Sequence, residues 1–240
     1  MTLLSDNERE RYHRQLIVPA VGEAGQEKLR RARVLVVGAG GLGSPVLLYL
    51  AAAGIGTLGI VDSDSVDLSN LQRQVLFTTL DIGRPKVDAA AERLASLNPN
   101  ITIKKYPVRL TNQNIDKILG GFDIAIDCCD NFTTRYLLSD ATTRVGKPMV
   151  YGAVYQFFGQ ASVFNFKDGP SYRSLFPEEL KAAEMEAETV PGIIGFLPGI
   201  IGAVEAGETI KIITGSGEVL SGRLLQVDAL TLRVEMITFC

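Results

Sequence analysis

The chain has 240 residues, of which 46% are hydrophobic and 21% charged, a composition typical of soluble globular proteins. Its 24 basic and 27 acidic side chains give a net charge of −3, which argues against a general nucleic-acid-binding protein. Three cysteines and one histidine exclude a disulfide scaffold and disfavour a metal centre built from several histidines.

The sequence shows no targeting or membrane-spanning segment. Met1–Asp6 lacks the basic region and apolar run of a signal peptide. The longest uncharged apolar stretch, Thr189–Val204, is shorter than the roughly 18 residues of a membrane-spanning helix, and it contains prolines and glycines. We therefore expect a cytoplasmic protein that binds neither membranes nor nucleic acids.

Helices and strands alternate over the first 150 residues. Ser5 and Glu8 fit a capping box at the start of a charged helix over Glu8–Gln15, and a second helix is expected over Glu23–Arg30. Arg33–Gly38 is typical of a strand buried on both faces. Further helices are expected over Ser44–Ala53, residues 84–97, Ile115–Leu119 and Phe132–Val145, and further strands over Gly59–Asp62, Thr102–Tyr106, Phe122–Asp127 and Pro148–Gly152.

This alternation predicts an α/β fold with a doubly wound, Rossmann-like and mostly parallel sheet. From residue 151 the pattern changes, because Tyr155–Phe166 and Gly222–Phe239 are typical of antiparallel hairpin strands that flank a helix. No change in composition marks a second domain, so we expect one domain over residues 1–240 with an N-terminal helical arm over residues 5–31.

A glycine motif, Gly38-x-Gly40-x-x-Gly43, falls between a predicted strand and a predicted helix. Glycine lets backbone amides approach phosphate closely, and a helix N-terminus adds a partial positive charge. Asp62 follows at the end of the next strand, where a carboxylate accepts hydrogen bonds from ribose hydroxyls. The pattern predicts a nucleotide site, with a tight structural turn as the alternative.

The residues after Asp62 differ from those of a dehydrogenase. The polar loop Ser69-Asn70-Leu71-Gln72-Arg73 contains an amide and a guanidinium, and Lys86 follows at a helix start. Two cations suit a triphosphate, whose departing pyrophosphate must be stabilised, better than they suit the diphosphate of NAD. We therefore expect a nucleoside triphosphate, although Arg73 taken alone is equally typical of a surface ion pair.

Asp127–Asn131 ends the fourth predicted strand, at the carboxyl edge where open α/β sheets bind ligands. Mg²⁺ is a hard cation that takes carboxylate oxygens. We expect Asp130 to hold it, because this residue lies past the strand end, and we expect Asp127 to be structural. Cys128 and Cys129 are expected to be small buried thiols without a catalytic role.

Together these motifs resemble those of the ThiF/MoeB/HesA family, relatives of the ubiquitin-activating enzymes. The resemblance runs from about Glu8 to Phe239, nearly the whole chain. It is carried by Arg11–Gln15, Gly38–Gly43, Asp62-x-Asp64-x-Val66, Ser69–Gln74, Gly83-x-Pro85-Lys86-Val87, Asp127–Asn131, Tyr151-Gly152-Ala153 and Gly222–Ala229.

The resemblance implies an adenylyltransferase that uses ATP and Mg²⁺ to activate the C-terminal Gly-Gly carboxylate of a small ubiquitin-like sulfur carrier protein. The carrier would serve thiamine, molybdopterin or related biosynthesis. Residues 32–150 would bind the nucleotide and residues 151–240 the carrier. Because a carboxylate is already ionised at neutral pH, its attack on the α-phosphate needs no general base, and His13 is expected to be structural.

The resemblance also assigns roles to individual residues. Gly41 would contact the phosphates, Asp62 the ribose, and Asp130 the Mg²⁺. A homodimer is implied in which Arg14, by itself typical of a helix-surface charge, reaches the ATP of the other subunit. The implied catalytic residues are Arg14, Arg73, Lys86 and Asp130. The implied nucleotide contacts are Gly38, Gly40, Gly41, Gly43, Asp62, Ser69, Asn70, Leu71, Gln72, Arg73, Lys86, Asp130 and Asn131.

Two features of many family members are missing. Their structural zinc is held by two Cys-x-x-Cys pairs, whereas this chain has Ser171 and Ser174 at the first and only Cys240 near the second, so we expect no zinc. Their loop cysteine corresponds to Glu188, in the glutamate-rich stretch Pro177–Glu188, which is typical of a solvated loop or short helix. We therefore expect adenylation without a covalent step through this loop.

Two alternatives stay open. A non-catalytic family member would bind a nucleotide or a partner without turnover, but the intact set Arg14, Arg73, Lys86 and Asp130 argues against it. An NAD(P)-dependent oxidoreductase would share the glycine motif, but the cations after Asp62 argue against that class.

Overall fold

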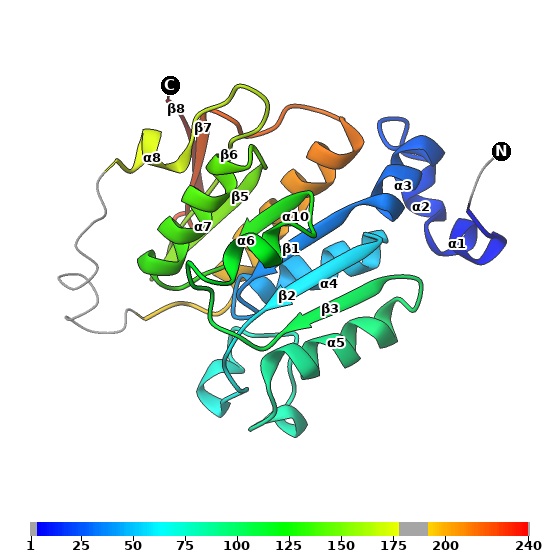
Figure 1. Ribbon diagram of the computed structural model, residues 1–240, viewed down its shortest axis with the longest axis horizontal. Helices are drawn as coiled ribbons and strands as arrows, with labels where there is room; N and C mark the ends of the chain where they lie inside the picture. The colour runs from blue at the N-terminus through cyan, green and yellow to red at the C-terminus, as the bar shows by residue number, and fades with distance from the viewer. Residues whose placement is uncertain (1–3, 178–191, 240) are drawn as a thin grey trace.

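The computed structural model describes residues 4–177 and 192–239. An eight-stranded sheet in the order β3-β2-β1-β4-β5-β6-β7-β8 forms its centre (Figure 1). The first five strands in this order are parallel and the last three run antiparallel to their neighbours. The strands are β1 Arg33–Val37, β2 Thr57–Val61, β3 Thr102–Tyr106, β4 Ile124–Asp127, β5 Met149–Tyr155, β6 Phe158–Phe164, β7 Arg223–Asp228 and β8 Arg233–Thr238.

Helices cover both faces of the sheet, which confirms the predicted doubly wound fold. β1 shows why, because Val34 and Val36 are buried in one hydrophobic core while Leu35 and Val37 are buried in the other. The first core lies under α3 Gly22–Arg31, α4 Gly43–Ala53, α5 Lys86–Leu97 and α10 Leu197–Thr214. The second lies under α6 Ile115–Leu119, α7 Phe132–Arg144 and α8 Tyr172–Leu175.

Strand order reverses between β1 and β4, since the chain builds β2 and β3 on one side of β1 and β4 and β5 on the other. Ligands of open α/β sheets bind at such a switch point, outside the carboxyl ends of the strands. The glycine turn after β1 and the Asp127–Asn131 stretch at the end of β4 both lie there. The topology therefore brings two separate sequence motifs to one edge of the sheet.

The N-terminal arm differs from its prediction. The capping box at Ser5 and Glu8 is present, but the helix divides at Tyr12 into α1 Asp6–Arg11 and α2 His13–Leu16. The buried Tyr12 ring packs against Gly54, and its hydroxyl accepts a hydrogen bond of 2.9 Å from Asn98 Nδ2. These contacts are made to residues more than 40 positions away, so no local pattern predicts the break.

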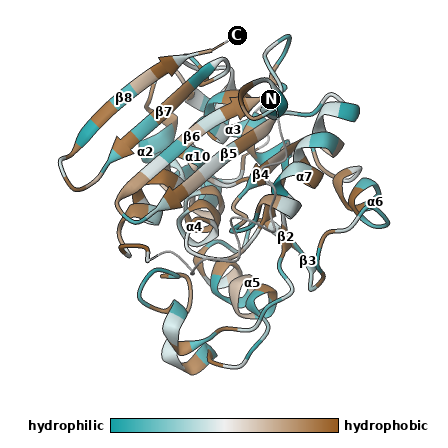
Figure 2. Ribbon diagram, turned by 90° about the vertical axis from the view of Figure 1, so that its left-hand side faces the viewer, coloured by the Kyte–Doolittle hydropathy of each residue, from teal (hydrophilic) through white to brown (hydrophobic). Residues whose placement is uncertain are grey.

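The antiparallel part of the sheet follows the prediction more closely. β5 continues to Tyr155, three residues past its predicted end, because it pairs with β6 along its whole length. β7 and β8 form a second hairpin, with β8 as the outermost strand (Figure 2). Two short 3₁₀ helices, η1 Leu68–Asn70 and η2 Thr79–Asp81, complete the elements of the described residues.

Three sequence-based predictions fall outside the described residues. They concern the glutamate-rich stretch, except its first residue Pro177, the position of Glu188, and the terminal Cys240. Among the residues that the structure does describe, every helix is too short or too polar to cross a bilayer.

Candidate active site

The turn between β1 and α4 requires glycine at two of its positions. Gly38 has a φ of +99°, and a Cβ built on it would lie 2.5 Å from the carbonyl oxygen of Cys128. A Cβ on Gly43 would lie 2.0 Å from the carbonyl oxygen of Gly38. Since both distances are shorter than any real contact, the turn closes tightly against the end of β4. It leads directly into α4, whose N-terminus can attract an anion.

Asp62 lies against this glycine turn at the end of β2. Its Oδ2 accepts a hydrogen bond of 2.8 Å from Ala39 N, and its Oδ1 accepts one of 2.8 Å from Asp64 N. Burial raises the pKa of this carboxyl group, and the positive charge of Lys86 opposes the rise. Each carboxylate oxygen retains a lone pair for a further donor, as a ribose hydroxyl would provide.

Lys86 is the first residue of α5 and is buried, with only 7% of its side chain exposed. Its ammonium lies 3.1 Å from Asp64 Oδ2, and its backbone N–H donates to the carbonyl oxygen of Asp64. Asp64 therefore holds Lys86 near Asp62. A largely desolvated cation at this edge of the sheet attracts phosphate strongly.

The polar loop after β2 folds over the glycine turn. Asn70 Oδ1 accepts hydrogen bonds from Arg73 Nη2 at 3.0 Å and from Gln74 Nε2 at 3.2 Å. A Cβ on Gly41 would lie 3.5 Å from Arg73 Cγ, so the arginine stem packs beside the turn. The structure thus brings Arg73 and the glycine motif together, as the sequence motifs predict.

Two residues at this turn received no role from the sequence. Gln74 is buried, its Nε2 lies 3.6 Å from a Cβ built on Gly40, and its Oε1 has no hydrogen-bond partner among the described residues. Pro198, in the first turn of α10, lies 3.3 Å from a Cβ built on Gly41. Gln74 belongs to the motif stretch Ser69–Gln74, which was a usable signal, whereas no local pattern marks Pro198.

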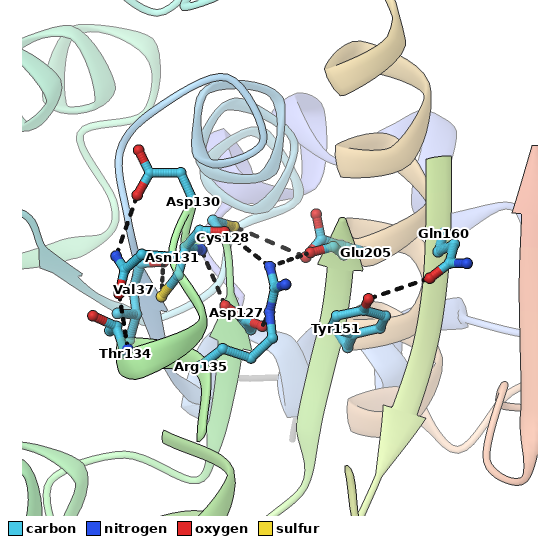
Figure 3. A network of polar contacts seen from close by, with 12 residues as sticks. Val37, Asp127, Cys128, Asp130, Asn131, Thr134, Arg135, Tyr151, Gln160 and Glu205 are labelled. Carbon is cyan, nitrogen blue, oxygen red and sulfur yellow. Dashed lines mark hydrogen bonds and ion pairs between the residues drawn. The ribbon is translucent and has the colours of Figure 1, made fainter. Parts of the chain in front are cut away.

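Asp127, the last residue of β4, and Asp130, three residues further on, have different environments. Asp127 is fully buried, and its Oδ2 lies 2.6 Å from Arg135 Nε (Figure 3). Asp130 is exposed, and its Oδ1 accepts a hydrogen bond of 3.3 Å from Asn131 Nδ2. Asn131 is the N-cap of α7, since its Oδ1 accepts from Thr134 N at 2.9 Å.

The cysteines between these aspartates are buried thiols. Cys128 Sγ lies 3.9 Å from Glu205 Oε1, and Cys129 Sγ lies 3.7 Å from the carbonyl oxygen of Val37. Burial raises the pKa of both thiols well above the ordinary value, with nearby carboxylates adding to the rise. Both groups are therefore protonated at neutral pH and are poor nucleophiles.

Arg14 is the predicted site residue that this fold does not bring to the others. It lies exposed on α2, and the arm packs where the strands begin, at the end of the sheet opposite the glycine turn (Figure 1).

Ser171 and Ser174 stand where many family members have a pair of zinc-binding cysteines. Their hydroxyl oxygens are 3.3 Å apart at the start of α8.

The fold and this edge of the sheet together define a class: an α/β protein with a doubly wound sheet and a cationic candidate site for a nucleotide. A model of the ThiF family matches residues 12–239. The chain therefore belongs to the ThiF family, which confirms the resemblance found in its motifs.

Named relatives agree with this assignment. The chain is 49% identical over 236 residues to a Thermus thermophilus protein named sulfur carrier protein adenylyltransferase, covering 96% of this chain and 87% of that protein. It is 47% identical over 240 residues to Mycobacterium tuberculosis MoeZ, named a probable adenylyltransferase/sulfurtransferase, covering 98% of this chain but 61% of MoeZ. The chain thus spans less than two thirds of the MoeZ protein.

Solved structures show the same fold at low identity. E. coli MccB in complex with ATP superposes with a TM-score of 0.84 and 22% identity, covering 95% of this chain and 71% of MccB. PaaA superposes with a TM-score of 0.87 and 22% identity, covering 100% of this chain and 86% of PaaA.

Proposed function

We propose that this chain is an adenylyltransferase that activates the C-terminal Gly-Gly carboxylate of a small ubiquitin-like sulfur carrier protein with ATP. The observation that carries the proposal is the packing of Asp62 and Arg73 against the glycine turn, with Lys86 beside Asp62, at the switch point of the sheet in a ThiF-family chain. The names of its relatives point to the same reaction.

In this proposal the glycine turn and the N-terminus of α4 bind the phosphates, and Asp62 binds the ribose hydroxyls. Arg73 and Lys86 neutralise the triphosphate and stabilise the charge that develops on the departing pyrophosphate. The carrier carboxylate is ionised at neutral pH and attacks the α-phosphorus in line, so no side chain has to remove a proton. Catalysis then consists of positioning and charge stabilisation.

Asp130 fits a Mg²⁺ ligand because it offers an exposed carboxylate at the sheet edge. No cluster of three or more His, Cys, Asp or Glu that could hold a metal occurs in residues 4–177 and 192–239. Mg²⁺ commonly takes one or two carboxylates and completes its shell with substrate phosphates and water, so a single aspartate suits it. Bound there, the ion would neutralise phosphate charge.

The partner and the pathway are part of the proposal. The antiparallel strands offer exposed apolar side chains such as Phe158, Val234 and Met236, which suit the apolar surface of a small protein. The reaction proceeds without zinc and without a covalent intermediate on a loop cysteine. Sulfur reaches the activated carrier from another protein, in a thiamine, molybdopterin or related cytoplasmic pathway.

ATP–pyrophosphate exchange tests this proposal. Purified protein is incubated with ATP, Mg²⁺, labelled pyrophosphate and candidate carriers that end in Gly-Gly, and the expected result is exchange that depends on the carrier. A carrier truncated by its last two residues is the control. ATP binding without exchange for any carrier would favour a non-catalytic member, and tight NADH binding would favour an oxidoreductase.

A further inference from the structure

The backbone just before Asp130 is held from both sides by a buried ion pair. Asp127 Oδ1 accepts a hydrogen bond of 3.0 Å from Cys129 N, while Arg135 Nη2 donates 2.9 Å to the carbonyl oxygen of Cys129. That carbonyl belongs to the peptide bond that joins Cys129 to Asp130. The ion pair therefore fixes the peptide plane from which the Asp130 side chain departs.

Arg135 also connects three separate elements. It lies on α7, pairs with the end of β4 through Asp127, and donates 3.3 Å to the carbonyl oxygen of Gly152 in β5. Its guanidinium carbon lies 5.1 Å from the centre of the Tyr151 ring. A lysine at this position has a single ammonium that cannot reproduce the planar fork of donors.

The carboxylate of Asp130 points away from this buried pair, toward the exposed side (Figure 3). Asn131 Nδ2 donates a hydrogen bond of 3.3 Å to this carboxylate, and Asn131 Oδ1 caps α7, so the residue that follows Asp130 is also held in place. Figure 3 draws one hydrogen bond to the Asp130 carboxylate, from Asn131, and none from a buried residue.

We infer that Arg135, with Asp127, is a positioning residue that presents the Asp130 carboxylate to the magnesium ion of MgATP. The inference rests on the proposed function, since it assumes that Asp130 binds this ion. Hydrogen-bond partners that orient a metal ligand typically change metal affinity by about 10–100-fold when they are lost. Arg135 itself is buried, so it would act through the peptide bond before Asp130 and not by direct contact with the ion.

The test measures binding of a fluorescent ATP analogue over a range of Mg²⁺ concentrations. For Arg135→Lys we expect the affinity without Mg²⁺ to stay within about twofold of wild type, while the Mg²⁺ concentration for half-maximal effect rises at least about tenfold. Asp130→Ala should show the same selective loss. Arg33→Lys, which alters an Arg–Asp pair with Asp123 at the opposite end of the sheet, should behave as wild type.

If Arg135→Lys fails to fold, Asp127→Asn/Arg135→Gln replaces it, because removing both charges leaves no unpaired buried charge. An unchanged Mg²⁺ dependence in the folded variant, or an equal loss of affinity with and without Mg²⁺, would overturn the inference. Wild-type binding that ignores Mg²⁺ would instead overturn the assignment of Asp130, and with it the proposed metal. Carrier-dependent exchange is not needed for either outcome.

Discussion

At the scale of single residues, Glu205 carries a buried carboxyl group that has no role in the proposed reaction. It is fully buried on α10, and its Oε2 has no hydrogen-bond partner among the described residues. Its carboxyl carbon would lie 2.4 Å from a Cβ built on Gly152, so the side chain packs closely against this glycine. Burial raises the pKa of this carboxyl well above its ordinary value, and the charge of Asp127 adds to the rise while Arg135 opposes it. Burial therefore favours the protonated, neutral form of Glu205, and it does the same for the thiol of Cys128 beside it.

Replacing Glu205 with glutamine should change how stability depends on pH. Because the pKa of Glu205 is higher in the native state than in the unfolded chain, where it is roughly 4.3, the contribution of this group to stability falls as pH rises above that value, by up to about 1.4 kcal/mol per pH unit. Glu205→Gln lacks this titration, so we expect its stability relative to wild type to rise between about pH 5 and pH 8. Urea unfolding at several pH values measures this. Glu218→Gln, at an exposed site, is the control, and parallel pH profiles for wild type and Glu205→Gln would contradict the prediction.

Substitutions of Asp130 and of the neighbouring cysteines should have very different effects on exchange activity. Asp130→Ala is expected to lower carrier-dependent exchange by about 10²-fold or more, because the lost metal contact stabilises phosphate charge by several kcal/mol. Cys128→Ser and Cys129→Ser should keep exchange within about threefold of wild type, since both thiols are protonated and buried. Exchange rates per folded protein measure this, and inactive but folded serine variants would assign the thiols a role.

At the scale of elements, we expect substitution in the glycine turn to lower the stability of the protein. Gly38→Ala places a methyl 2.5 Å from the Cys128 carbonyl oxygen at a φ of +99°, so we expect a loss of about 2–3 kcal/mol. Gly207→Ala is the matched control, because this glycine lies inside α10 with nothing within 4 Å of the new methyl. The control should gain about 0.5–1 kcal/mol from helix propensity. Equal melting temperatures for the two variants would contradict this account of the turn.

The elements also show what sequence can and cannot predict. Thr102–Tyr106 and Ile115–Leu119 are observed with their predicted bounds, because local pattern and flanking residues define them. Asp62 and Asp130 were predictable from the sequence, because they are polar residues at strand ends. Arg135 and Glu205 were not, since their importance depends on contacts across the fold, from α7 and α10 to the end of β4. Such contacts leave no periodic signal in the chain.

At the scale of the whole molecule, the arm and the site lie at opposite ends of the sheet (Figure 1). If Arg14 contributes to catalysis, as the homodimer implied by the family resemblance requires, it must therefore act on the site of a second copy. In a two-fold dimer each arm would reach the partner's nucleotide, so that every site draws on both chains. This arrangement can be tested by mixing two inactive variants.

Arg14→Ala and Asp130→Ala should each be nearly inactive in exchange. When equal amounts are unfolded together and refolded, half of the dimers are mixed, and one of the two sites in each mixed dimer has both Arg14 and Asp130 intact. Exchange should then recover to about one quarter of the wild-type rate. Two Asp130→Ala preparations treated alike are the control and should stay inactive. A mixture that also stays inactive, in a sample whose mass shows dimers, would mean that Arg14 does not act across the interface.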